Sequence, residues 1–211
     1  MVGWMTTEVY MHISEGVLSA PVLIGGAGLA AAGTAIGLKK VDYDQVMTVA
    51  ILSAAFFIAS LVHVPIGPAN AHLVLNGLLG VILGWAAFPS ILVALALQAV
   101  LFQFGGLTVL GLNTFTMAAP AVFCFYVFRP LLTKGNGSRF AAAFGCGFCA
   151  ILLSTILTAG ALSFSGEAFE NAAKALFIAH LPIMVIEGVI TGFAYTFLAK
   201  VKPEALAVSS S

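Results

Sequence analysis

Long apolar runs dominate this sequence, and few charged residues interrupt them. We mark apolar segments at residues 18–38, 46–62, 72–88, 90–103, 112–132, 139–162 and 176–198. A helix that crosses the ~30 Å hydrocarbon core of a bilayer needs about 20 mainly apolar residues, so these runs predict about seven spans. They are continuous and lack the alternation of barrel strands, which excludes a transmembrane β-barrel. We therefore expect an all-α, polytopic bundle of transmembrane helices.

The composition excludes a water-soluble domain. Of the 211 residues, 61% are hydrophobic and 8% are charged, whereas about 25% of the residues in a typical soluble domain are charged. Eight basic and eight acidic residues leave no net charge, so the sequence gives no electrostatic reason to expect a nucleic-acid partner. A chain of this length fits one membrane domain.

The basic residues predict the orientation. They follow the first, fifth and seventh apolar segments, as Lys39, Lys40, Arg129, Lys134, Arg139, Lys200 and Lys202. By the positive-inside rule these loops belong to the cytoplasm, which puts the N-terminus outside and the C-terminus inside. The third and fourth segments are short and separated only by Phe88-Pro89-Ser90, so we expect each to be steeply placed, partly re-entrant or shielded by neighbouring helices.

All four histidines fall near the predicted outer face. They are His12 before the first segment, His63 and His72 around the second loop, and His180 at the start of the last segment. Two prolines and a glycine lie between His63 and His72, which predicts irregular backbone there. A single histidine is more often an interfacial or hydrogen-bonded residue, but four on one side favour a transition-metal site, because imidazole is the commonest ligand of such ions.

Glu187 is a carboxylate deep within an apolar segment, seven residues after His180. An ionisable residue at that depth is a candidate functional residue. It could orient a metal-binding histidine, or it could satisfy polar groups between helices, and the residues alone do not choose. Other polar residues in the spans, Asn76, Gln98 and Asn113, are expected to form hydrogen bonds between helices. The Cys146-x-x-Cys149 pair lies in an apolar stretch and is expected to pack.

Four separate motifs resemble one known family. They are MHISEGVLS at residues 11–19, HVPIGPANAHL at 63–73, FGGLTVLGLN at 104–113 and HLPIMVIEGVITG at 180–192. In this order they resemble the CbiM/NikM family, the substrate-capturing membrane subunits of energy-coupling-factor transporters for nickel and cobalt. The likeness covers residues 11 to about 200.

The resemblance implies a set of metal ligands. In the family the ion is held by the amine of the first methionine, the backbone nitrogen and imidazole of the next histidine, and a later histidine. Carried over, these are Met11, His12 and His72, with His63, His180 and Glu187 as residues that either orient these ligands or act as alternative ligands. Such a nitrogen set favours a square-planar ion such as nickel(II).

The sequence departs from the family pattern at its start, because ten residues precede Met11. A peptide nitrogen at Met11 could not act as the terminal amine. Residues 1–10 have neither the basic start nor the apolar run of a signal peptide, so we expect translation to begin at Met11, with 11–211 forming one metal-capture domain. Phe104 stands where members often carry an acidic residue, and Ile66-Gly67-Pro68 replaces the Pro-Gly-Gly of cobalt-type sequences.

We therefore expect a subunit for uptake of nickel or cobalt ions in the bacterial inner membrane, with no permanent cofactor and no enzymatic activity of its own. The sequence contains no P-loop motif, so the resemblance implies separate ATPase subunits, a transmembrane coupling subunit and, in some systems, a small accessory membrane subunit. The alternative is a haem-binding anchor of a redox complex, in which the histidines form axial pairs. An intramembrane metalloprotease is disfavoured because the HExxH motif is absent.

Overall fold

The computed structural model describes residue 16 and residues 18–43, 46–66, 69–133, 139–166 and 170–206. Its elements, in chain order, are α1 (Ala20–Lys39), α2 (Val46–Ala59), β1 (His63–Ile66), β2 (Ala69–His72), α3 (Asn76–Leu83), the 3-10 turn η2 (Gly84–Ala86), α4 (Ala87–Phe102), α5 (Leu110–Leu132), α6 (Arg139–Ser165), α7 (Glu170–Val201) and the 3-10 turn η4 (Pro203–Leu206). The predicted all-α fold is confirmed, with a two-stranded hairpin added to it.

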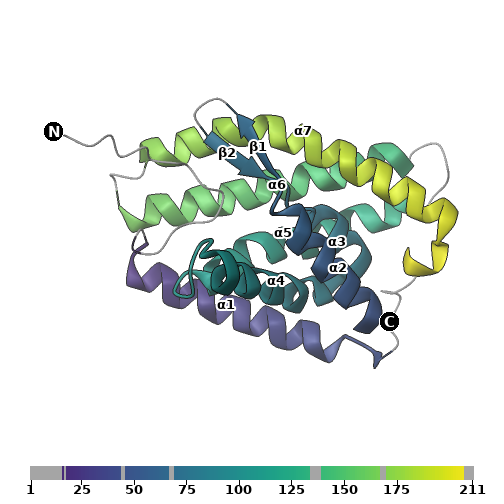
Figure 1. The fold of residues 1–211 in the computed structure, drawn as a ribbon, viewed down its shortest axis with the longest axis horizontal. Helices are drawn as coiled ribbons and strands as arrows, with labels where there is room; N and C mark the ends of the chain where they lie inside the picture. The colour runs from purple at the N-terminus through teal and green to yellow at the C-terminus, as the bar shows by residue number, and fades with distance from the viewer. Residues whose placement is uncertain are drawn as a thin grey trace.

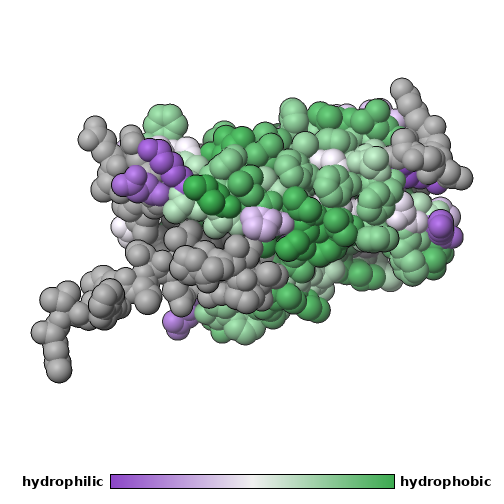
Figure 2. Space-filling model, turned by 90° about the horizontal axis from the view of Figure 1, so that it is seen from above, coloured by the Kyte–Doolittle hydropathy of each residue, from purple (hydrophilic) through white to green (hydrophobic). Residues whose placement is uncertain are grey.

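Five helical stretches in the described residues are long and apolar enough to cross a membrane. Four of them are single helices, Ala20–Lys39, Leu110–Leu132, Arg139–Ser165 and Ala173–Val201; the fifth, Asn76–Phe102, qualifies by length and composition but is interrupted at η2. The space-filling view shows an apolar surface along the middle of the molecule, with hydrophilic residues gathered toward its two ends (Figure 2). The chain is therefore a multi-pass membrane protein. Seven full spans remain a prediction, because α2 has 14 residues and α3 has eight.

Small residues set the helix packing. The ribbon places α6 and α7 side by side along one edge and α1 along the opposite edge (Figure 1). A side chain at Gly147 of α6 would lie 2.6 Å from the Thr191 hydroxyl of α7, and one at Gly188 of α7 would lie 2.9 Å from the Phe144 ring of α6. Glycine thus lets these antiparallel helices approach closely, as expected where packing drives association in lipid.

The third helix begins inside the bundle. The side chain of Asn76, its first residue, reaches Met117 about a third of the way along α5 and Ser154 near the middle of α6. From there α3 runs alongside α5 until Gly84, which lies next to Phe125. It is therefore a half-length helix that starts at mid-depth, and the non-helical residues 73–75 lead into it.

The chain then reverses direction at η2. Gly84 has a φ of +54°, in the left-handed region that glycine adopts easily. Beyond the turn, α4 starts beside Gly37 near the end of α1 and finishes beside α2, where Phe102 contacts Phe57. The predicted re-entrant character of this region agrees with that path.

Two boundaries predicted here are wrong. The break falls at η2 and not at Phe88-Pro89-Ser90, because Pro89 lies in the first turn of α4, where its missing N–H breaks no helical hydrogen bond. The predicted helical segment 72–88 also begins too early, since His72 ends strand β2 and α3 starts only at Asn76.

Close backbone contact at α3 gives a first testable prediction. A Cβ on Gly80 would lie 2.6 Å from the carbonyl carbon of Ala121 in α5, so Gly80→Ala must push two backbones apart. We expect a loss of about 1–3 kcal/mol in unfolding free energy, measured as a lower unfolding temperature in detergent. Gly28→Ala is the matched control, because a Cβ there meets nothing within 4 Å. Equal stability of the two variants would contradict this packing.

Candidate metal-capture site

The hairpin brings two of the predicted histidine positions together. Strands β1 and β2 pair antiparallel, and their register sets His63 directly opposite His72. Directly paired residues in such a ladder have Cα atoms about 4.5–5.5 Å apart. Strand β2 contacts α7, and the hairpin lies beside that helix in the ribbon (Figure 1). The sequence predicted irregular backbone between these histidines and did not predict the strands.

Glu187 anchors the segment that follows His72. Its buried carboxylate accepts hydrogen bonds from the backbone N–H of Val74 and, at 3.1 Å to each oxygen, from that of Leu75. Leu75 precedes α3 with a φ of +55° and provides no side-chain cap. A carboxylate from α7 therefore takes the place of an N-terminal cap, at the helix end where the backbone dipole favours negative charge. These bonds engage both carboxylate oxygens. Glu187 therefore supports residues 73–75, which form the connector between β2 and α3.

Asn76 and Gln98 join neighbouring helices. The side-chain amide of Asn76 donates to Ser154 Oγ of α6 at 2.9 Å and to the Met117 carbonyl of α5 at 3.3 Å. Gln98 of α4 donates from its amide to the Ser60 hydroxyl. Asn113 is buried in the first turn of α5.

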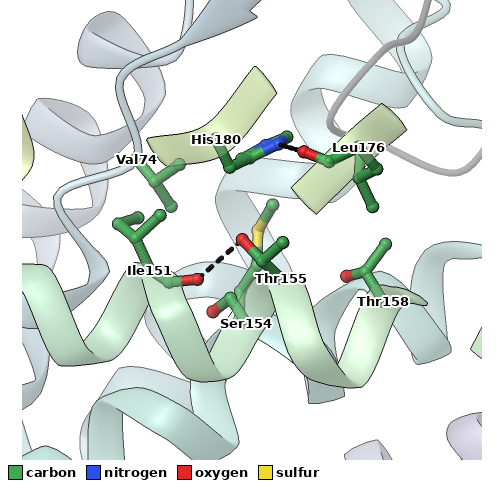
Figure 3. A pocket seen from close by; sticks show the side chains of 8 residues that line it. Val74, Ile151, Ser154, Thr155, Thr158, Leu176 and His180 are labelled. Carbon is green, nitrogen blue, oxygen red and sulfur yellow. Dashed lines mark hydrogen bonds between the residues drawn. The ribbon is translucent and has the colours of Figure 1, made fainter. Parts of the chain in front are cut away.

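His180 lies in α7, one helical turn beyond Leu176, and is buried. Its Nδ1 is 2.6 Å from the Leu176 carbonyl oxygen. The imidazole faces a small cavity that α6 lines with Ser154, Thr155 and Thr158 (Figure 3). These hydroxyls were not predicted from the sequence, although the spacing of Ser154 and Thr158, four residues apart on one helix, puts both on the same face.

Met11 and His12 lie outside the described residues. The nearest well-anchored positions are Leu18, which is buried against Leu112 and Leu176, and Ser19, whose N–H donates to Ser165 Oγ at 3.1 Å. The start of α1 is thus fixed to the end of α6. Within the described residues no group of three His, Cys, Asp or Glu residues is arranged to hold a metal ion; a site completed by Met11 and His12 falls outside that search.

The cysteines show packing contacts. Cys124 and Cys146 are buried, Cys149 is partly buried, and all three are free thiols. Cys146 donates to the carbonyl of Gly77 at 3.4 Å, which places it at the contact between α3 and α6.

A haem site receives no support from this geometry. Axial haem ligation needs histidines that approach one plane from its two sides. Among the described residues, His180 is the one histidine in a helix, and His63 and His72 share a hairpin.

Comparisons with known proteins agree on one family. Residues 12–205 match the model of the CbiM family, described as the cobalt uptake substrate-specific transmembrane region. A Haemophilus influenzae protein assigned to metal transport is 39% identical, over 93% of this chain and 97% of that one. The cobalt transport protein CbiM of Sorangium cellulosum is 31% identical, over 93% of this chain and 94% of that one.

The crystal structure of a truncated transition metal transporter superposes with a TM-score of 0.76 at 31% identity, covering 90% of this chain and 98% of that one. These matches show that the chain belongs to the CbiM family of cobalt uptake transmembrane proteins.

Proposed function

We propose that this protein captures nickel or cobalt ions at the outer face of a bacterial inner membrane for uptake into the cell. The observation that carries the proposal is the position of His72, at the end of a hairpin whose connector is held by the buried carboxylate of Glu187. A metal ligand needs such support, because residues that orient ligands contribute strongly to metal affinity.

In this proposal the ligands are the amine of Met11, the backbone nitrogen and imidazole of His12, and the imidazole of His72. The buried Leu18 lies six positions after His12, and a chain of that length can span up to about 20 Å. Leu18 and Ser19 are anchored at the end of the bundle where α6 ends, which supports a site for the first two ligand residues within that reach. Glu187 acts as a positioning residue for His72 and does not coordinate the ion.

Energy for transport comes, in this proposal, from ATPase subunits that act through a transmembrane coupling subunit, because this chain carries no P-loop. The relative called fused nickel transport protein NikMN in Rhodobacter capsulatus is longer, since this chain covers 64% of it, and its fused further part supports joint action with another component. The N-terminus lies outside, since Lys39, Arg129 and Lys200 mark the ends of α1, α5 and α7 and basic loops favour the cytoplasm.

Uptake tests the proposal. Cells that lack their own nickel and cobalt importers should accumulate one or both of these ions when they express this chain together with the ATPase and coupling subunits of an energy-coupling-factor transporter. The same cells expressing a variant with both His12 and His72 replaced by alanine should accumulate only the background amount. Equal accumulation by the two strains, or haem absorbance in the purified protein, would refute the proposal.

A further inference from the structure

A small cavity with four apolar and four polar lining residues lies beneath the hairpin connector, between α5, α6 and α7. Its volume is about 10 Å³, and it is lined by Val74, Met117, Ile151, Ser154, Thr155, Thr158, Leu176 and His180. Val74 is also the residue whose N–H donates to Glu187, so the cavity adjoins the proposed metal-capture site without containing its ligands. Figure 3 shows His180 and Leu176 of α7 facing Thr155 and Thr158 of α6 across it.

The hydrogen bonds of His180 leave one ring nitrogen unused. A carbonyl oxygen can only accept, so Nδ1 must carry the hydrogen in its 2.6 Å contact with Leu176. In the neutral imidazole Nε2 is then an acceptor, and no protein group in the described part of the chain donates to it. The side chain as a whole is 3% exposed and the residue lines the cavity, so a molecule in the cavity can reach this acceptor.

Hydroxyl groups across the cavity supply the complementary donors. Ser154 Oγ accepts the amide of Asn76 at 2.9 Å, which leaves its own hydrogen free to donate. Thr155 uses its hydroxyl hydrogen on the Ile151 carbonyl at 2.8 Å. Thr158 is buried and also lines the cavity.

We propose that this cavity binds one water molecule, which donates to His180 Nε2 and hydrogen-bonds the hydroxyls of Ser154 and Thr158. A volume of about 10 Å³ is close to the minimum for one water, and a buried water typically has two to four polar partners. The water completes a chain of hydrogen bonds from the Leu176 carbonyl through His180 and Ser154 to Asn76, the first residue of α3. It therefore ties α7 and α6 to the helix that follows the hairpin.

A metal ion is the competing occupant, because imidazole and the thioether of Met117 are both metal ligands. The lining residues include no carboxylate or thiolate to balance a divalent charge, and an unpaired charge in such a place is strongly unfavourable. The chemistry of the cavity thus favours a neutral occupant.

A high-resolution crystal structure of the whole chain tests the site directly. We expect one spherical density peak within hydrogen-bond distance of His180 Nε2, of Ser154 Oγ and of Thr158 Oγ1, in crystals grown with and without nickel. Data collected at the nickel absorption edge should show no anomalous signal at that peak. An empty cavity, or an anomalous peak within it, would overturn the proposal, and neither result depends on where the transported ion binds.

A double-mutant cycle provides a second test in solution. If one water joins the two groups, Thr158→Val and Ser154→Ala should each lower the unfolding temperature, and the double variant should lose clearly less than the sum of the two shifts. Ser163→Ala, at an exposed position of the same helix, is the control and should combine additively with Thr158→Val. Additive shifts for the first pair would argue against a shared water.

Discussion

Replacing His72 by alanine is expected to lower the affinity for nickel or cobalt by more than about 100-fold, since loss of a ligand should exceed the 10–100-fold cost of losing a residue that orients one. The measurement is equilibrium binding of each ion to the purified protein. The hairpin should survive the change, because its register and the hydrogen bonds of the connector use backbone groups and Glu187. The unfolding temperature of the metal-free variant should therefore stay close to that of the wild type.

His63→Ala is the matched control, since His63 occupies the paired position on the neighbouring strand. Both variants remove one imidazole from the same pair of the same hairpin. We expect His63→Ala to weaken binding much less than His72→Ala. The assignment of His72 would be wrong if the order of the two effects were reversed, and the ligand would then be His63.

The second large effect is expected at Glu187. Glu187→Leu leaves the N–H groups of Val74 and Leu75 without their acceptor inside the bundle. Each unsatisfied buried group costs about 1–3 kcal/mol, so the unfolding free energy should fall by about 2–6 kcal/mol. Because the connector then loses its anchor, metal affinity should also fall by about 10–100-fold, as for other groups that orient ligands.

Two further variants separate positioning from general damage. Glu187→Gln keeps one oxygen acceptor and should recover part of both losses. Thr191→Val changes a buried residue one turn along α7 whose hydroxyl has no hydrogen-bond partner in the described structure, so it should leave metal affinity unchanged. Affinities are compared at a temperature where every variant is folded. Wild-type metal affinity in folded Glu187→Leu would show that the carboxylate does not position the site.

The sequence predicted the membrane-spanning helices well because their signal is local. The described helices α1, α5, α6 and α7 each overlap a predicted apolar segment. Most of their ends lie within about three residues of the predicted ends, and the exception is the start of α7, six residues earlier than predicted. Apolar length decides such helices, and the basic residues at their ends mark where they stop. Even Pro120 within α5 and Pro182 within α7 did not mislead the prediction, since transmembrane helices tolerate proline.

The half-length α3 and the hairpin could not be predicted in the same way. Residues 73–102 form an almost unbroken apolar stretch, so hydropathy gives no indication that the chain turns at Gly84. The turn depends on tertiary contacts, among them Gly37 against Trp85 and Gly80 against Ala121. The strands depend on pairing between His63–Ile66 and Ala69–His72. Pro65 lies within the first strand, and proline normally weakens a prediction of strand.

The candidate site shows the same division. Glu187 stood out in the sequence as a carboxylate within an apolar span, but its partners are backbone N–H groups of Val74 and Leu75, which no residue pattern marks. His180 likewise stood out, whereas its partner is the Leu176 carbonyl of the preceding turn. Sequence identified which residues are unusual, and the fold was needed to find what each one contacts.

The most direct test of the central claim combines two measurements on one sample. The protein is purified from cells grown with nickel and cobalt, its mature N-terminus is sequenced, and its bound metal is quantified. A chain that begins at Met11 and carries about one nickel or cobalt ion would support capture through an amine and two imidazoles, and the dominant metal would identify the substrate. A chain that retains residues 1–10 and still binds one ion would contradict the Met11 ligand, and a chain that begins at Met11 without metal would contradict the site altogether.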